Sequence, residues 1–480
     1  MAIIENGLSA NVMRNKMESK EELAKKGALY VGTGGKMSVT PDGGGAVVEI
    51  PETSSIAPDL LNDNDKVLVA DSTSSVGWTI KECPKATTAK TAEKAVGYSQ
   101  GGEIEAELNT IKTQLAVLEA IINIKKAKIY GVDLVGSENP DALVRTDDAV
   151  GLNFTTSDAG TGYAEITSDF DNCYPWCDMQ EVTDASGNVF IKIPKFYSKI
   201  TKNADGTYKH QLSGIKHEGF STLFMDRVGF EIDYVLVGKY EGSGSAERVY
   251  SKWNETVLTT ITLDDFRTAC RANGAGYQQY DFLIDLIIKE LWLVEMKTTN
   301  CQSIMAGYTN GDKAITTGET HYVTTPSGSN GSNTDGKHAM KYRGIENLWG
   351  NIQTWCDGIS FKNQSVYVCT DPAFYKAGET TSPYVYQGQR SADDGYVKKV
   401  EVLYSPYTQN SLIQYTTETG GSSTTYFCDY CDYAVVDGVA LTVGGYFRSS
   451  GTAGLWNWDG HYTSSVKNDL IGGRLCYKPL

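Results

Sequence analysis

Six apolar residues between positions 104 and 122 follow one another in alternating steps of four and three. This spacing is a heptad repeat, with Leu108, Leu115 and Ile122 at the a positions and Ile104, Ile111 and Leu118 at the d positions. Leu at a with Ile at d favours three or four strands over two. The repeat predicts a short trimeric coiled coil over residues 103–126. The alternative is one amphipathic helix that packs on its own domain.

The predicted coiled coil divides the chain into three parts, and together they predict a multidomain α+β protein. Residues 1–102 contain short β-like runs at 28–31, 46–50 and 67–70, separated by Gly, Pro, Asn and Asp turns. Residues 127–480 contain many short strand-like runs and a helical patch. Thr262 is a predicted helix cap, and residues 277–297 are apolar almost all round, which is typical of a buried helix. Residues 360–432 form a Tyr-rich insertion without a clear period.

The charge balance excludes some classes of partner. The 480 residues include 43 basic and 59 acidic side chains, for a net charge of -16. No basic face is available to release counterions from nucleic acid or to dock on an anionic membrane. The start of the chain lacks the charged and apolar regions of a signal peptide. The longest apolar segment, 282–296, contains charged residues. We therefore expect no membrane insertion and synthesis in the cytoplasm.

Ten cysteines are scattered along the chain, and free thiols are the default for a chain without a secretion signal. Cys428 and Cys431 have half the spacing of a zinc knuckle, but the five histidines are not placed to complete it. Buried thiols are the better interpretation, and we expect neither a metal centre nor a cofactor. A structural calcium ion is compatible with the composition, although the sequence identifies no ligands for it.

The stretch 444–475 combines aromatic, small polar and charged residues without an apolar period of 2 or 3.6. This mixture is typical of a binding surface on a rigid scaffold, and the alternative is a glycine-rich connection before a last strand. Alternation along a strand would place Trp456 and Trp458 on one face as a platform for a sugar ring or an apolar protein patch. The alternative is that one of the two is core. The predicted ligand-binding residues are Tyr446, Arg448, Ser449, Thr452, Trp456, Asn457, Trp458, Asp459, His461 and Tyr462.

Four blocks carry a resemblance to a known family: residues 234–241, 262–272, 344–358 and the stretch 444–475. Together they resemble the C-type-lectin-like fold of the formylglycine-generating-enzyme family. They are more similar still to the phage tip proteins and retroelement-diversified variable proteins built on that fold. The resemblance covers about 234–478, and the segment 193–196 is typical of the phage versions. It does not extend to the first hundred residues.

The block 344–358 is the most specific of the four. Its Asn347, Trp349, Gly350, Asn351 and Trp355 match the family's Asn-Val-Trp-Glu-Trp-like motif. Buried indole N–H groups need partners and Asn side chains can brace loops, so we interpret this block as scaffold. The resemblance implies that Gly444, Gly445, Gly472 and Arg474 lie at the strand ends that hold the variable segment.

The resemblance implies a phage virion fibre, on tail or head, that is located on the virion surface. Residues 1–102 would anchor it to capsid or tail proteins, and the coiled coil would make a homotrimer. A lectin-like head at 127–480 would bind a glycan or a protein on the host surface. The alternatives are a formylglycine-generating oxidase and a bacterial surface adhesin. Thr354 replaces the motif's usual Glu, and Cys428, Cys431 and Cys476 do not reproduce the copper-binding pair. We therefore expect no enzyme activity, and the missing secretion signal argues against an adhesin.

Overall fold

The computed structural model divides the chain into two compact units, Met1–Ala120 and Ile121–Leu480. It describes five short strands between residues 29 and 82, and then residues 101–158, 162–224, 230–404, 411–433 and 439–479. The described residues are rich in β-sheet and contain few helices. This agrees with the predicted β-rich α+β composition.

The strands of the first unit form two small antiparallel sheets. One has the order β1 (Leu29–Val31), β2 (Met37–Val39), β3 (Val48–Ile50), and the other pairs β4 (Lys66–Ala70) with β5 (Trp78–Glu82). The predicted β-like runs at 28–31, 46–50 and 67–70 coincide with β1, β3 and β4.

Helix α5 (Gly101–Ala127) contains the predicted heptads and crosses the boundary between the two units. Its apolar a and d residues are exposed in the single chain: Ile111 by 49%, Leu115 by 54%, Leu118 by 56% and Ile122 by 49%. The last turn is held by the second unit. The Lys126 carbonyl accepts hydrogen bonds from the Gly214 N–H at 2.8 Å and the Ser213 hydroxyl at 3.1 Å. The helix end is therefore fixed, while its apolar stripe is open to solvent.

The described residues of the second unit form six sheets. In spatial order, a four-stranded sheet comprises β12 (Tyr197–Lys202), β13 (Tyr208–Ser213), β6 (Ile129–Asp133) and β7 (Val144–Asp147). A five-stranded sheet comprises, in the same way, β10 (Gln180–Thr183), β11 (Val189–Pro194), β14 (Tyr234–Gly238), β31 (Leu475–Tyr477) and β17 (Tyr277–Gln279). Another comprises β20 (Ile345–Glu346), β19 (Met340–Tyr342), β18 (Ser327–Ser329), β9 (Ala164–Ser168) and β8 (Phe154–Asp158).

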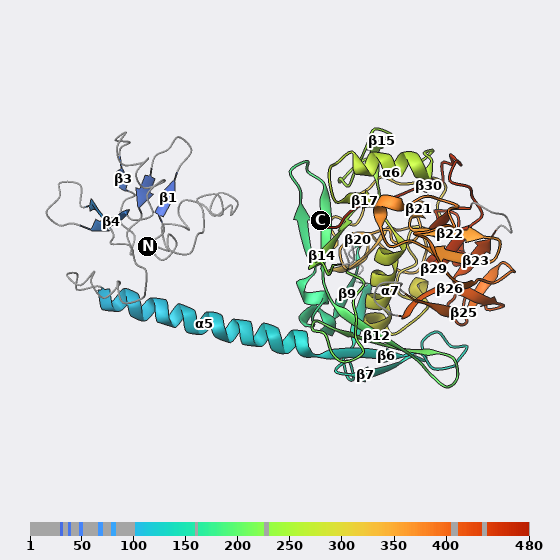
Figure 1. Ribbon diagram of the computed structural model, residues 1–480, viewed down its shortest axis with the longest axis horizontal. Helices are drawn as coiled ribbons and strands as arrows, with labels where there is room; N and C mark the ends of the chain where they lie inside the picture. The colour runs from blue at the N-terminus through green and yellow to red at the C-terminus, as the bar shows by residue number, and fades with distance from the viewer. Residues whose placement is uncertain are drawn as a thin grey trace. The chain divides into compact units, whose positions relative to one another are not determined.

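The largest sheet, which we call the central sheet, has seven strands. In spatial order they are β26 (Ser411–Thr419), β25 (Gly395–Tyr404), β27 (Tyr430–Tyr433), β29 (Gly454–Gly460), β28 (Leu441–Gly444), β21 (Gln353–Cys356) and β30 (Ile471–Gly472). Two smaller sheets are β22 (Ile359–Lys362), β23 (Ser365–Val368), β24 (Val385–Gln389), and the pair β15 (Ser243–Ser245), β16 (Arg248–Tyr250). The Tyr-rich stretch 360–432 therefore supplies the sheet β22–β24 and one edge of the central sheet (Figure 1).

The helices of the second unit are short apart from one. They are α6 (Leu263–Arg271), α7 (Phe282–Met296) and α8 (Cys301–Ile304), with 3₁₀ turns η2 (Asp169–Asn172), η3 (Trp176–Asp178), η4 (Pro372–Phe374) and η5 (Ser450–Thr452). The predicted cap is confirmed for α6, because the Thr262 side chain accepts a hydrogen bond from the Asp265 N–H.

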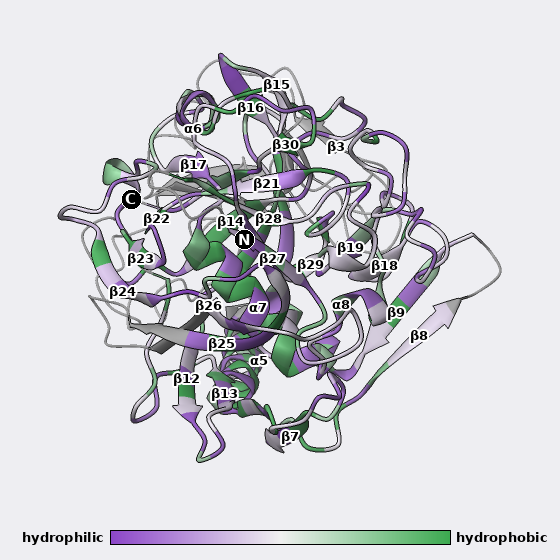
Figure 2. Ribbon diagram, turned by 90° about the vertical axis from the view of Figure 1, so that its right-hand side faces the viewer, coloured by the Kyte–Doolittle hydropathy of each residue, from purple (hydrophilic) through white to green (hydrophobic). Residues whose placement is uncertain are grey.

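Helix α7 is the centre of the second unit's core. Every one of its residues is buried, as the all-round apolar pattern predicts, and Figure 2 shows it coloured hydrophobic along much of its length. The prediction was wrong about where the helix begins. Residues 277–279 form β17 because they pair with β31, and Asp281 then caps the helix by accepting from the Ile284 N–H. The buried charges are paired, with Lys289 Nζ 2.6 Å from the Asp285 carboxylate.

Within the described residues, no helix is both long enough and apolar enough to span a bilayer. The nine cysteines in these residues are free, and Cys177 alone among them is exposed. No group of three or more His, Cys, Asp or Glu side chains in the described part of the chain is arranged to hold a metal ion.

Candidate binding face on the central sheet

Strand β29 runs through the middle of the central sheet and carries the predicted aromatic residues. It pairs in parallel with β27, where Asp432 lies opposite Asp459, and antiparallel with β28, where Thr442 lies opposite Asp459. Side chains alternate between the two sides of a strand. Trp456 and Trp458 therefore share one side of the sheet, while Asn457 and Asp459 share the other.

The predicted exposed platform of two indoles is wrong, because both rings lie on the inner side of the sheet. Trp456 is 3% exposed and Trp458 is 2% exposed. The Trp456 ring lies 5.5 Å from the Phe427 ring, and Lys289 of α7 lies over the Trp458 ring at 5.4 Å. Burying two large apolar rings against α7 is the more favourable arrangement. Both Trp residues are therefore core.

The outer side of β29 carries Asn457 and Asp459, which are both buried at the base of this face. The Asn457 side-chain NH₂ donates to the Tyr430 carbonyl at 2.8 Å and to the Thr452 carbonyl at 3.1 Å. The Asp459 carboxylate accepts from the Gln353 side-chain NH₂ and from the His461 backbone N–H, both at 2.9 Å. These two residues therefore connect β29 with the loops on either side of it.

The loop after β28 holds four of the predicted residues near Asn457. The Tyr446 N–H donates to the Ser449 hydroxyl at 2.9 Å, and the Thr452 hydroxyl donates to the Ser449 carbonyl at 2.6 Å. Arg448 is exposed and donates to the Asp312 carbonyl at 2.6 Å. Gly444 begins the loop with a φ of 90°, and a Cβ there would lie 2.7 Å from the Leu348 carbonyl oxygen. The chain requires glycine at this position.

His461 and Tyr462 follow β29 and contact one another with their ring centroids 5.6 Å apart. The His461 Nδ1 lies 3.5 Å from the Asp432 carboxylate. Burial raises the pKa of the Tyr462 hydroxyl, and the nearby Asp459, Tyr446 and Asp432 raise it further. The loop before β29 and the loop after it therefore meet on the outer side of the sheet.

Four residues of this face were not predicted from the sequence. Tyr396 and Tyr430 pack with their rings 5.4 Å apart, and Asp432 neighbours Asp394, which accepts from the Tyr433 N–H at 2.7 Å. The alternation of Tyr430 and Asp432 within Cys-Asp-Tyr-Cys-Asp-Tyr could have indicated a strand with a polar side. That segment drew attention only for the spacing of its cysteines.

We call this surface the tyrosine–carboxylate face. It comprises Tyr396, Asp394, Tyr430, Asp432, Tyr446, Asn457, Asp459, His461 and Tyr462. Its four tyrosines are all half-buried. Burial raises the pKa of Asp459 to about 6. Burial, followed by the charge of Asp394, raises the pKa of Asp432. Rigid aromatic area next to hydrogen-bonding groups can bind a partner surface.

The block 344–358 lies beneath this face with its polar groups satisfied internally. The side-chain NH₂ groups of Asn347 and Asn351 donate to Glu241 at 3.0 and 2.5 Å. The Trp349 indole N–H donates to the Met305 carbonyl at 2.9 Å, and that of Trp355 to the Ile261 carbonyl at 3.4 Å.

Three of the remaining scaffold residues lie at the strand ends, as the resemblance implies. Gly445 opens the loop after β28 with a φ of 73°, and Gly472 ends β30. Arg474 is buried and donates to the carbonyls of Gly238, Lys239, Glu346 and Asn347. These bonds connect the end of the chain with β14 and β20.

The three cysteines weighed for copper chemistry are buried. Burial raises the pKa of Cys428, Cys431 and Cys476 to about 12 in each case. A thiolate is the nucleophile and the metal ligand, and reactive cysteines have lowered pKa values. These thiols are therefore suited to packing rather than to oxidase chemistry.

No protein family matches the sequence, and no curated protein matches it. Three solved structures align with the chain. The "Major Tropism Determinant U1 Variant" is 11% identical over 73% of this chain and 72% of its own, with a TM-score of 0.25. The "I1 Variant" is 12% identical over 74% and 72%, with a TM-score of 0.26. The "M1 Variant" is 11% identical over 73% and 72%, with a TM-score of 0.24.

Proposed function

We propose that this chain is a phage virion fibre or tip protein whose head binds a receptor on the host surface through the tyrosine–carboxylate face. The observation that carries the proposal is the set of half-buried tyrosines around Asn457 and Asp459 on the outer side of the central sheet. Tyr supplies large contact area at a low cost in conformational entropy. The resemblance of the four sequence blocks to phage tip proteins supports the same assignment.

The proposal includes a homotrimer held in part by residues 104–122 of α5. Its support is the row of exposed Leu and Ile residues at the a and d positions. An amphipathic helix gains most of its stability by packing its apolar side, so these residues need a cover in solution. Residues 1–102 would attach the trimer to capsid or tail proteins, which follows from the resemblance alone.

The proposal predicts that Tyr446→Ala with Tyr462→Ala weakens adhesion of the purified protein to host cells. A central aromatic contact is worth about 2 kcal/mol or more, so we expect a loss of about 30-fold or more per site. Trimeric display multiplies the effect through avidity. Adhesion is measured with labelled protein over a concentration series, and the melting temperature is measured in parallel.

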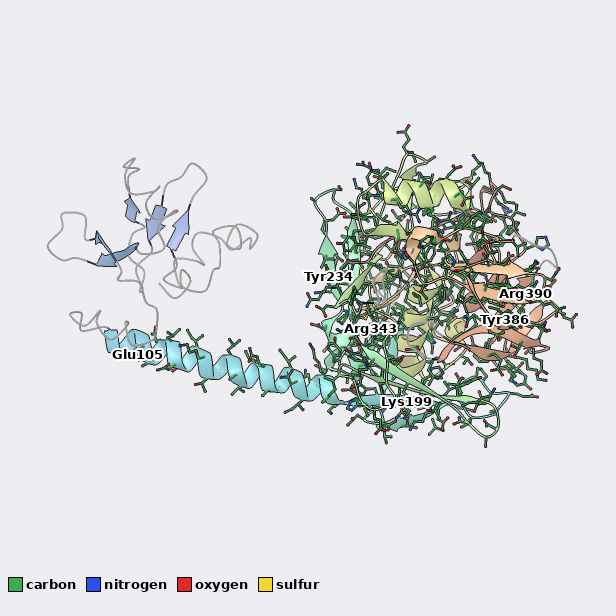
Figure 3. All side chains as sticks on the ribbon, in the orientation of Figure 1. Glu105, Lys199, Tyr234, Arg343, Tyr386 and Arg390 are labelled. Carbon is green, nitrogen blue, oxygen red and sulfur yellow. The ribbon has the colours of Figure 1, made fainter. Side chains whose placement is uncertain are left out.

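The matched control is Tyr386→Ala, because Tyr386 is 52% exposed and lies on β24, away from the face (labelled in Figure 3). It should leave adhesion within about twofold, as surface substitutions outside a contact usually do. If the double variant folds and adheres like the unchanged protein, the receptor site lies elsewhere on the head.

A further inference from the structure

The two buried amides at the base of the face each have an acceptor atom without a partner. Asn457 is 7% exposed and Gln353 is 3% exposed, and neither the Asn457 Oδ1 nor the Gln353 Oε1 has a hydrogen-bond partner within the described residues. Their NH₂ groups are already committed, to the carbonyls of Tyr430 and Thr452 and to the Asp459 carboxylate. The amides are therefore oriented by their donors, and what each lacks is a donor.

The carboxylates of the face need donors too. The Asp432 side chain is 44% exposed, and its neighbours are the exposed Asp394 and the imidazole of His461. Like charges held close together are costly, and a bound cation relieves that cost. Perturbed carboxylates at an accessible position are typical of functional sites.

The two arginines nearest to the face are engaged elsewhere. Arg390 (labelled in Figure 3) is buried, lies over the Tyr433 ring at 4.2 Å and donates to the carbonyls of Ser391 and Asn363. Arg448 lies over the Phe447 ring at 5.0 Å and donates to the Asp312 carbonyl. The acidic groups on the outer side therefore remain open to a cation from a partner.

We propose that the tyrosine–carboxylate face recognises a basic side chain, arginine or lysine, of a receptor protein, with Asp394 and Asp432 as its charge partners and Tyr396 and Tyr430 beside it. This rests on the proposed receptor-binding function and adds the chemistry of the ligand. An ammonium or guanidinium group supplies only donors, which is what the two unpartnered amide oxygens and the carboxylates require. Aromatic faces attract such a cation further. A protein receptor is favoured because a mixture of Tyr, Asn and Ser is typical of surfaces that bind proteins.

The test compares a biotinylated oligo-arginine peptide with its oligo-citrulline counterpart, which has the same shape without the charge. The full-length chain is measured against each peptide by biolayer interferometry at about 150 mM salt, where long-range attraction between exposed charges is largely screened. We expect the arginine peptide to bind at least about tenfold more tightly than the citrulline peptide, which is about 1.4 kcal/mol. Equal binding of the two peptides would overturn the inference.

The site variant is Asp394→Asn with Asp432→Asn, and the matched control is Glu218→Gln with Glu247→Gln. Each removes two negative charges, and the control residues are exposed and lie far from the face in sequence. Asn at 394 keeps an oxygen that can accept from the Tyr433 N–H. We expect the site variant to lose about tenfold in affinity for the arginine peptide and the control to lose less than about twofold. Equal losses would show that overall charge attracts the peptide and would refute the site. Asp432→Asn alone is the fallback if the double variant melts early.

Adhesion to host cells separates this inference from the proposed function. If the Tyr446 and Tyr462 substitutions abolish adhesion while the site variant adheres normally, the receptor face stands and the cationic ligand is wrong. If neither variant changes adhesion, both are wrong. Pretreatment of the cells with protease should abolish adhesion, whereas periodate should not. Loss after periodate alone would identify a glycan receptor and contradict the protein ligand.

Discussion

At the scale of single residues, the acidic groups of the second unit differ mainly in how deeply they are buried. Burial raises the pKa of Glu241 to about 7 and that of Glu290 to about 8, although the Ser198 hydroxyl lowers the latter in part. A carboxyl whose pKa is raised by folding binds protons more readily in the folded state. Ionising such a group therefore lowers the stability of the fold.

Asp459 gives a prediction of this kind at the binding face. Its carboxyl ionises at about pH 6 in the folded chain, above its ordinary value of 3.8, so it lowers stability as the pH rises between these values and at full strength above about pH 6. Asp459→Asn removes the charge, and the Gln353 amide can turn to offer its unpartnered oxygen. We expect the variant to be more stable by about 1–2 kcal/mol at pH 8, with the difference vanishing towards pH 4.

Denaturant unfolding at several pH values measures this difference. Glu218→Gln, at an exposed carboxylate, is the control and should stay within about 0.5 kcal/mol of the unchanged protein at each pH. A variant that is less stable at pH 8 than at pH 4, relative to the unchanged protein, would contradict the assignment of Asp459 as a buried and costly charge.

The sequence predicted part of the binding face and could not predict the rest. Alternation correctly placed Trp456 and Trp458 on the same side of a strand, but local sequence does not say which side packs on a helix. Asp394 and Asp432 come from segments that precede β29 in the chain. The parallel pairing of β27 with β29 brings Asp432 to Asp459, and no local pattern encodes that pairing.

At the scale of elements, helices were easier to predict than strands. Residues 282–296 were recognised as a buried helix because their apolar pattern is continuous, and α6 because Thr262 is a strong cap. Residues 277–279 were wrongly included in the helix, since their partner strand β31 lies at the other end of the chain. Strand order depends on such distant partners, whereas a helix depends on its own sequence and one apolar side.

Helix α5 gives the prediction at this scale. Ile111→Asp with Leu115→Asp places two charges in the predicted seam and should convert a trimer of about three times 52.3 kDa into monomers, measured by light scattering. The matched control is Asn109→Asp with Ala116→Asp, because both residues lie at b positions of the same heptads and are exposed. It should remain trimeric.

The head should keep its melting temperature in both α5 variants. The hydrogen bonds that hold the last turn of α5 involve Lys126, Ser213 and Gly214, which none of these changes touches. An unchanged protein that is already monomeric at micromolar concentration would refute the coiled coil.

At the scale of the whole molecule, the sheets of the second unit join segments from all parts of its sequence. Strand β31 lies between β14 and β17, so it fills an interior position of its five-stranded sheet. Arg474, just before it, binds four carbonyls of two other segments. Sequence patterns gave the composition of this unit correctly but not its strand order.

Removal of residues 475–480 should therefore abolish cooperative unfolding of the second unit. Without β31, the strands β14 and β17 lose their common partner, and two unpaired edges remain that can pair with other chains. We expect a soluble fraction that is small and sensitive to protease, measured by limited proteolysis and by thermal unfolding. A truncated chain that melts as sharply as the full one would show that the sheet is complete without β31.

The position of β31 also sets an order of events in time. A ribosome makes β10, β11, β14 and β17 long before β31, so their sheet has to wait for the final segment while the rest of the chain is already outside the tunnel. Domains dominated by distant pairings fold slowly, and their exposed edges invite aggregation during the wait. Translation speed near the 3′ end of the message and the supply of chaperones should therefore govern the yield of this protein.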